Sequence, residues 1–169
     1  MPRILIVYDS REGVIYGMAK AVAEAARKED VEAILEDVSA AEPMDLLKYD
    51  GLIIGSPCFF GNMTGKIKTF IDATWNIRGK LTGKVGAAFT SERHLGGGGE
   101  LTLRAINSAL LIHGMVVQGD AGGCPFGAIA LDPTGDRDEV VAEEGDACRR
   151  LGVRVARLVK ELPARTHKP

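Results

Sequence analysis

The chain has 169 residues and a mass of 18.0 kDa, which fits one domain. Its 21 Lys and Arg residues and 23 Asp and Glu residues give a formal net charge of −2, which favours neither a nucleic-acid-binding protein nor a strongly acidic docking protein. Glycine is the unusual component, with 21 residues, and indicates tight loops and close backbone approach.

The three cysteines, Cys58, Cys124 and Cys148, form no CxxC pair and no metal-ligand spacing. We therefore expect reduced thiols in a cytoplasmic protein without a metal site. The apolar run Ile4–Val7 is too short for the core of a signal peptide, and no apolar run approaches the roughly 20 residues needed to span a bilayer. The sequence thus predicts no membrane partner.

Short apolar runs recur along the chain and are continuous, as is typical of strands buried on both faces of a sheet. A further segment, Val31–Val38, alternates apolar with polar residues and predicts an edge strand. The continuous runs are Ile4–Val7, Leu52–Ile54, Val85–Phe89 and Met115–Val117.

Amphipathic helical patterns separate the predicted strands. Asn62 is the expected N-cap of the second helix, and Gly114 is the expected residue just past the end of the third. We expect one domain over residues 1–162 and a frayed tail over 163–169. The helical patterns cover residues 15–26, 63–74, 103–113 and 147–162.

This alternation of buried strands and helices predicts an α/β fold with helices on both faces of a five-stranded parallel sheet. We expect the strand order 2-1-3-4-5. Ligands of such sheets bind beyond the carboxyl ends of the strands, where the strand order reverses. The loops after the first, third and fourth strands are therefore the candidate site.

The loop after the first strand has the chemistry of a phosphate cradle. Ser10 offers a hydroxyl group, Gly13 permits close backbone approach, and the following amides point outward at a helix N-terminus. The negative charges of Asp9 and Glu12 would repel a phosphate, and only the positive charge of Arg11 offsets them. Backbone amides would therefore do most of the binding. An ordinary strand–helix turn is the alternative.

The loop after the third strand offers flat apolar surface. Pro57 stiffens the loop, Phe59 and Phe60 supply aromatic rings, and Gly61 permits a tight turn. The alternative is that one or both rings fold back into the core. Cys58 could be a reactive thiol, but no neighbouring residue acidifies it, and we expect it simply to fit the loop.

Four consecutive glycines, Gly96–Gly99, follow the fourth strand and precede a helix. They favour a mobile loop that presents backbone donors and acceptors to a planar heterocycle, with a flexible surface loop as the alternative. Arg93 and His94 could meet a negatively charged co-substrate, although single exposed residues of this kind are more often only solvated.

The segment Cys58–Asp72, CFFGNMTGKIKTFID, resembles the flavin loop and following helix of the WrbA-type NAD(P)H:quinone oxidoreductases, within the flavodoxin-like superfamily. The segments VYDSREGVIYGMAKAVAEA, GGGGE, HGMVV and GGCPFGA occur in the same order as in that family. The resemblance implies a flavodoxin-like three-layer sandwich and an FMN-dependent oxidoreductase. NADH or NADPH would deliver hydride to the flavin, and a quinone would then take two electrons.

The resemblance also implies where a non-covalent FMN is held. Its phosphate would bind the first loop, and its ring system would lie between the other two loops. His113 matches a family histidine near the flavin and is the candidate catalytic residue; alternatively it stabilises the end of its helix. The implied cofactor-binding residues are Ser10, Arg11, Glu12, Gly13, Val14, Ile15, Pro57, Cys58, Phe59, Phe60, Gly61, Asn62, Ser91, Glu92, Arg93, Gly96 and Gly97.

Relatives often carry an aromatic residue where Glu12 stands, an arginine where Phe59 stands, and a long insertion in place of the short connection Ser39–Lys48. Because insertions help larger assemblies form, we expect a homodimer in preference to a homotetramer. The alternative function is a flavodoxin-like electron carrier with no NAD(P)H oxidation of its own. Such carriers need strong acidic complementarity to their partners, which a net charge of −2 disfavours.

Overall fold

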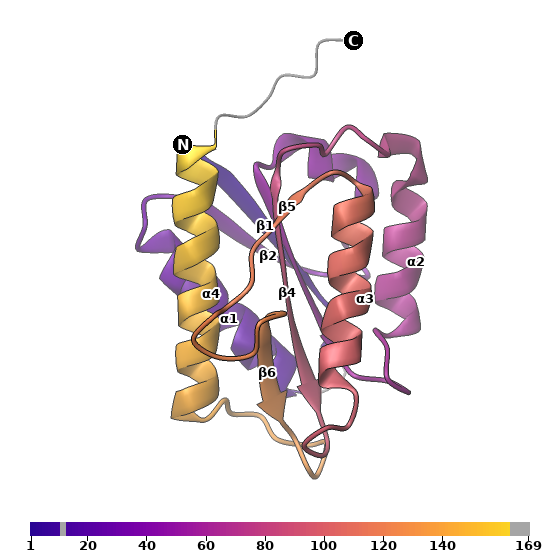
Figure 1. Ribbon diagram of the computed structural model, residues 1–169, viewed down its shortest axis with the longest axis vertical. Coiled ribbons are helices and arrows are strands. Elements are labelled where there is room, and N and C mark those ends of the chain that lie inside the picture. The colour runs from indigo at the N-terminus through magenta and orange to yellow at the C-terminus, as the bar shows by residue number, and fades with distance from the viewer. Residues whose placement is uncertain (11–12, 163–169) are drawn as a thin grey trace.

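The computed structural model describes residues 1–10 and 13–162 (Figure 1). The predicted contacts of Arg11 and Glu12 and the predicted tail over 163–169 lie outside the described residues. The elements, in chain order, are β1 (Arg3–Tyr8), α1 (Gly13–Arg27), β2 (Glu32–Asp37), η1 (Pro43–Lys48), β3 (Gly51–Pro57), α2 (Gly65–Ala73), η2 (Thr74–Ile77), β4 (Val85–Glu92), α3 (Gly99–Ile112), β5 (Val116–Val117), β6 (Ala128–Leu131) and α4 (Ala142–Glu161).

A parallel sheet with the strand order β2-β1-β3-β4-β5 forms the middle layer, which confirms the predicted order. Figure 1 shows α1 and α4 on one face of the sheet and α2 and α3 on the other. β2 lies at one edge, as its alternating sequence predicts. The three-layer α/β sandwich therefore agrees with the sequence analysis.

The fifth position of the sheet is filled by two short strands. β5 pairs with Val85 and Gly86 at the start of β4, and β6 pairs with Phe89–Glu92 at its end. The ten residues 118–127 separate these two strands. The apolar run Met115–Val117 predicts β5, whereas the four residues of β6 are too few for a periodic pattern and β6 was not predicted.

Two apolar clusters, one on each face of the sheet, form the core. The cluster under α1 and α4 includes Ile6 and Phe89, and the cluster under α2 and α3 includes Leu5 and Leu103. Only glycine fits at position 55 of β3, because a Cβ on Gly55 would lie 2.1 Å from Cζ of Phe89. The close packing of this ring explains one glycine of the enriched composition.

The predicted N-cap of α2 was wrong. Thr64, not Asn62, caps the helix, and its side chain accepts a hydrogen bond from the amide of Ile67. The backbone of Asn62 is bridged to Phe59 in a tight turn, so the chain cannot enter the helix there. Gly114, with φ of +75°, follows the end of α3 as predicted.

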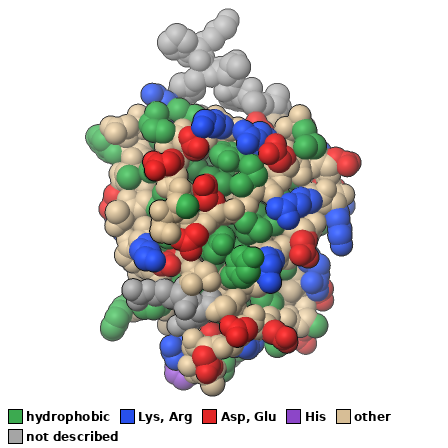
Figure 2. Space-filling model, turned by 180° about the vertical axis from the view of Figure 1, so that it is seen from behind, with side chains coloured by type: hydrophobic (Ala, Val, Ile, Leu, Met, Phe, Trp, Pro, Cys, Tyr) green, Lys and Arg blue, Asp and Glu red, His purple; other side chains and the backbone are tan. Residues whose placement is uncertain are grey.

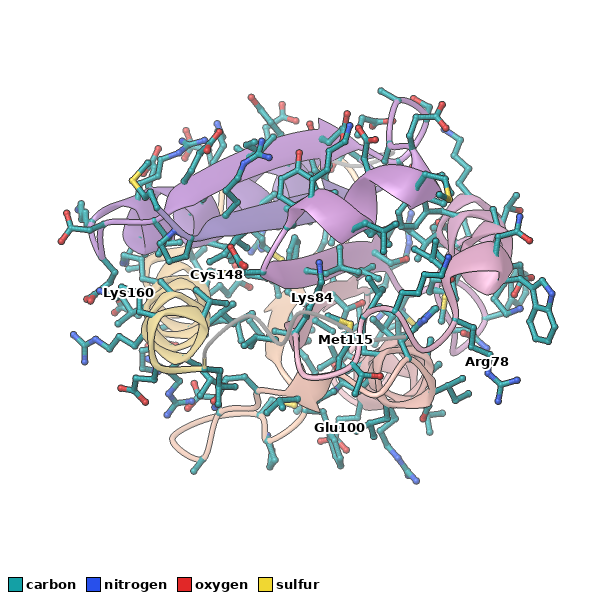
Figure 3. The ribbon with its side chains drawn as sticks, turned by 90° about the horizontal axis from the view of Figure 1, so that it is seen from above. Arg78, Lys84, Glu100, Met115, Cys148 and Lys160 are labelled. Carbon is teal, nitrogen blue, oxygen red and sulfur yellow. The ribbon has the colours of Figure 1, made fainter. Side chains whose placement is uncertain are left out.

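The amino end of the sheet, where the strands begin, is held by a half-buried lysine, Lys84 (Figure 3). Nζ of Lys84 donates hydrogen bonds to the carbonyl oxygens of Leu46 at 3.1 Å and Leu47 at 2.9 Å, and also to that of Tyr49. Burial lowers the pKa of Lys84. This side chain therefore ties the end of η1 to the residue that precedes β4.

Figure 2 shows basic and acidic side chains interspersed over the face of the molecule opposite to the view of Figure 1. This mixture agrees with the small formal net charge of the sequence. Among the described residues, no helix is both long enough and apolar enough to cross a membrane.

Candidate flavin site

The loop after β3 forms a tight turn that presents an aromatic ring to solvent. Phe59 and Asn62 exchange backbone hydrogen bonds of 2.8 and 3.0 Å, and the two residues between them, Phe60 and Gly61, have φ of +50° and +73°. Two consecutive left-handed residues are the geometry of a type I′ turn. Glycine adopts this conformation freely but phenylalanine does not, and strain of this kind concentrates at ligand sites.

The side chain of Phe60 is fully exposed and that of Phe59 is half-buried. The alternative in which Phe60 folds into the core is therefore excluded. A large apolar ring held in solvent by a strained turn favours a binding role for this loop.

The glycine-rich loop after β4 packs directly on the loop after β3. Sγ of Cys58 lies 3.5 Å from the carbonyl oxygen of Gly97. Gly98, with φ of +107°, approaches so closely that a Cβ there would lie 2.9 Å from Cα of Gly61 and 3.1 Å from Sγ of Cys58. The structure thus brings together two loops that are separated by more than thirty residues in the sequence.

Glu92, the last residue of β4, has a structural role that the sequence analysis did not anticipate. Its side chain is buried, and its two carboxylate oxygens accept hydrogen bonds from the amides of Gly96, at 3.2 Å, and Gly99, at 2.7 Å. A carboxylate at this position satisfies free amides at the N-terminus of α3 and complements the helix dipole. The carboxylate of Glu92 is therefore committed to this cap, and its predicted contact with the cofactor stays a prediction.

These two loops enclose an open cleft at the carboxyl end of the sheet, where the strands finish. The cleft has a volume of about 220 Å³. Every residue that lines it belongs to the implied cofactor site: Pro57, Cys58, Phe59, Phe60, Ser91, Glu92 and Arg93.

The loop after β1 ends at the same end of the sheet. Asp9 is only 1% exposed; one of its carboxylate oxygens lies 3.8 Å from Nζ of Lys66, and the other is buried without a hydrogen-bond partner among the described residues. Ser10 is half-buried, and α1 begins at Gly13. The predicted phosphate loop therefore contains a buried carboxylate as well as a helix N-terminus.

A fourth segment, residues 132–141, also reaches this end of the molecule, and the sequence analysis missed it. A Cβ at Gly13 would lie 2.3 Å from Oδ1 of Asp138, and the Arg93 guanidinium donates a 3.0 Å hydrogen bond to the carbonyl oxygen of Thr134. Asp132 orders the segment by accepting hydrogen bonds from the amides of Gly135 and Arg137. The turn residues of this segment predict a loop, but nothing in their pattern indicates what the loop packs against.

His113 does not line this cleft, and its implied role beside the flavin stays a prediction. It caps the C-terminus of α3, whose 14 residues span about 21 Å, whereas the cleft lies at the N-terminus of that helix. The neighbouring Gly114 accepts a hydrogen bond from Gly83, just before the start of β4. β4 starts near His113 and ends at Glu92 in the cleft, so His113 and the cleft lie at opposite ends of this strand.

His113 instead takes part in packing at the amino end of the sheet. Its Nε2 lies 2.7 Å from the hydroxyl of Thr74, and that hydroxyl donates to the carbonyl oxygen of Ile71, so Nε2 carries the proton of this bond. Burial, followed by the nearby charge of Arg78, lowers the pKa of His113. His113 also lines a groove of about 520 Å³ between α2 and α3, together with Trp75 and with Asn62 of the loop after β3.

The sheet order and the convergence of an aromatic loop, a glycine-rich loop and a helix N-terminus at its carboxyl end define a flavodoxin-like protein with a flavin-type site. Comparisons with known proteins then give the family. The profile of the family described as NADPH-dependent FMN reductase matches residues 44–125.

Two curated relatives are similar over almost their whole length. An NAD(P)H dehydrogenase (quinone) of Gluconacetobacter diazotrophicus is 36% identical over 200 positions, which cover 97% of this chain and 100% of the relative. An NAD(P)H dehydrogenase (quinone) of Acidithiobacillus ferrooxidans is 34% identical over 198 positions, which cover 96% of this chain and 99% of the relative. The chain belongs to the NAD(P)H dehydrogenase (quinone) family, which confirms the predicted family and class of enzyme.

Solved structures agree. The crystal structure of the flavodoxin, WrbA-like protein from Agrobacterium tumefaciens has a TM-score of 0.79 and 25% identity and covers 96% of this chain and 99% of its own. An archaeal flavodoxin with 23% identity and a TM-score of 0.76, covering 94% of this chain and 99% of its own, shows the fold alone. The first curated alignment has 200 positions against 169 residues here, so at least 31 of them have no counterpart in this chain.

Proposed function

We propose that the chain binds FMN at the carboxyl end of its sheet and transfers two electrons from NADH or NADPH to a quinone. The observation that carries this proposal is the cleft of about 220 Å³ between the two loops, with a strained, exposed Phe60 on one side. Membership of the NAD(P)H dehydrogenase (quinone) family supports the reaction.

The residues present fit this cofactor. The backbones of Gly61 and Gly98 approach each other so closely that a Cβ on Gly98 would clash with Gly61, and this contact holds together the two loops that enclose the cleft. The rings of Phe59 and Phe60 line the cleft, and such an apolar lining suits a flat ring system. Ser10 and the first amides of α1, from Gly13 to Ile15, would hold the phosphate.

When bound, FMN supplies the two-electron chemistry, and the chain's own residues bind, orient and shield it. Phe60 offers a ring face to a flat ligand, and the apolar loop beside it excludes water. Glu92 holds the glycine loop at the start of α3, so that Gly96 and Gly97 keep a fixed position beside the cleft. No side chain needs to act as a nucleophile.

An anaerobic titration tests the proposal. The FMN-loaded protein should lose the absorbance of oxidised flavin on addition of NADH or NADPH and regain it with benzoquinone. A flavin that binds but stays oxidised until a separate reductase is added would instead identify an electron carrier. Failure to bind FMN would refute both functions.

We also propose that the protein forms a homodimer in the cytoplasm, with a homotetramer as the larger alternative. Trp75, Leu111 and Ile112 are exposed near the groove that His113 lines. Because His113 does not line the cleft of its own chain, we assign any catalytic role for it to a site that a second copy completes. Light scattering of the FMN-loaded protein tests the assembly, and Trp75→Glu should shift it towards monomer.

A further inference from the structure

The segment 132–141 packs on the first turn of α1 through a groove made by two glycines, Gly13 and Gly17, which are one helical turn apart. A Cβ at Gly13 would lie 2.8 Å from Cα of Asp138, and a Cβ at Gly17 would lie 2.6 Å from Cγ2 of Val140. Both distances are shorter than real Cβ contacts. The absence of side chains on this face of α1 therefore brings Asp138 to the helix N-terminus.

The segment is held in this position from several sides. The carboxylate of Asp132 accepts hydrogen bonds from the amides of Gly135 and Arg137, and Nη2 of Arg137 forms a 2.6 Å ion pair with Glu144 of α4. Arg93 binds the carbonyl oxygen of Thr134. Asp138 thus sits on a well-anchored segment rather than on a free loop tip.

In the described part of the chain, no hydrogen bond or ion pair of the Asp138 side chain explains the position of this residue. Its side chain is exposed, and no hydrogen bond or ion pair joins its carboxylate to another residue in the described part of the chain. Among the described residues, the nearby cations have other partners: Arg93 donates to the carbonyl oxygen of Thr134, Arg137 pairs with Glu144, and Lys66 lies 3.8 Å from Asp9. Asp138 therefore places a negative charge beside the N-terminus of α1 without an ion-pair partner in the described part of the chain.

We propose that Asp138 is a specificity-determining residue that disfavours phosphorylated flavin relative to riboflavin. This inference rests on the proposed function, because flavin is the ligand. A phosphate group and the Asp138 carboxylate are both attracted to the partial positive charge of the same helix N-terminus, and they repel each other. Riboflavin carries no phosphate and does not meet this repulsion.

Figure 2 shows acidic side chains gathered at the lower end of the molecule, the end at which β4 and β6 finish in Figure 1. Asp9, just after β1, is buried in the same region, and Lys66 lies 3.8 Å from its carboxylate. Asp138 has no such ion-pair partner among the described residues, so the amides of α1 must bind the phosphate against its charge.

Flavin affinities measured by fluorescence quenching test the proposal, with FMN and riboflavin titrated separately into the wild-type protein, Asp138→Asn and Asp136→Asn. Asp138→Asn should bind FMN about tenfold more tightly, with riboflavin affinity unchanged within about twofold. Asp136 is the matched control, because it lies in the same segment but the nearest contacts of Gly13 and Gly17 come from Asp138 and Val140. Its variant should leave the FMN-to-riboflavin ratio unchanged within about twofold.

Added salt should shrink the difference between the wild-type protein and Asp138→Asn, since exposed charges are screened. Asp138→Ala serves as a second variant that should give the same shift. An equal change for both flavins, or weaker FMN binding in both Asp138 variants, would refute a charge-based preference. If neither flavin binds any variant, the proposed function fails as well; if both bind with an unchanged ratio, only this inference fails.

Discussion

The two ends of α3 use buried polar groups in opposite ways. At its C-terminus, His113 meets Thr74, and nearby Lys84 meets three carbonyl oxygens, so these groups bind other parts of the protein. At its N-terminus, the capping carboxylate of Glu92 supports a glycine-rich loop beside the exposed ring of Phe60. Polar groups at the amino end therefore maintain the fold, whereas those at the carboxyl end maintain an opening.

This difference predicts that substitutions at the carboxyl end change flavin affinity, with or without a loss of stability, whereas those at the amino end change stability alone. The largest effect is expected for Gly98→Val. The valine side chain would enter the space of Cys58 and Gly61, at a position whose φ of +107° is strained for any residue with a Cβ. We expect FMN affinity to fall about a hundredfold, measured by fluorescence titration.

The matched control for Gly98→Val is Gly79→Ala at the amino end. Gly79 has a φ of +80°, but a Cβ there would meet no atom within 4 Å, so this variant introduces backbone strain without disturbing the contact between the two loops. It should lower the free energy of unfolding by about 1 kcal/mol and leave FMN affinity unchanged. Equal losses of FMN affinity in both variants would show that strain alone, and not the close contact of the two loops, causes the effect.

The next largest effect is expected for Glu92→Gln. An amide in place of the carboxylate retains one acceptor but loses the charge that complements the N-terminus of α3, and its NH₂ group would face the amide of Gly96 or Gly99. We expect the free energy of unfolding to fall by about 2 kcal/mol in urea titrations, with a smaller loss of FMN affinity as the glycine loop loosens. An unchanged unfolding midpoint would show that the cap is not important for stability.

The contrast between the two ends also explains what could be predicted from the sequence. Continuous apolar runs and helical spacing are local, so β1, β3, β4 and the order of the sheet follow from them. The loops at the carboxyl end carry glycine and phenylalanine. The sequence alone shows that these loops have backbone freedom and exposed aromatic rings, because neither property depends on a contact with a distant segment. The residues that line the candidate cleft are therefore among those that the family resemblance implies, although the cleft lining does not include Gly61, Asn62, Gly96 or Gly97.

Features that depend on contacts between distant segments were not predictable. The capping role of Glu92 depends on the path of the chain over the next seven residues, and the approach of Asp138 to Gly13 joins parts of the chain that share no pattern. The place of His113 follows from the direction of α3, which carries its C-terminal residue away from the site that its first turn supports. A resemblance in sequence around a histidine does not show which end of the sheet it occupies.

A smaller effect on stability, with none on binding, is expected for Lys84→Met. The methionine fills similar volume but leaves the carbonyl oxygens of Leu46, Leu47 and Tyr49 without their shared donor. We expect a loss of about 1.5 kcal/mol in the free energy of unfolding and an unchanged FMN affinity. Lys80→Met, at an exposed position four residues earlier, is the control and should change neither quantity. A loss of FMN affinity in Lys84→Met would contradict the separation of the two ends.

The smallest effect is the pH dependence that His113 gives to the amino end. Its Nε2–H is engaged with Thr74, so a second proton would go to Nδ1, which is buried without a partner among the described residues. Because burial lowers the pKa of His113 in the folded state, the unfolded chain binds the proton more readily. The contribution to stability is therefore complete above the ordinary histidine pKa of 6.5 and is lost as the pH falls below it through the lowered pKa of the folded state.

Urea titrations at several pH values should show this loss of stability, and His113→Gln, which still donates to Thr74 but does not titrate, should reduce it. His94→Gln, at an exposed histidine beside the cleft, should retain it, and an identical pH dependence in His113→Gln and the wild-type protein would show that His113 is not its source.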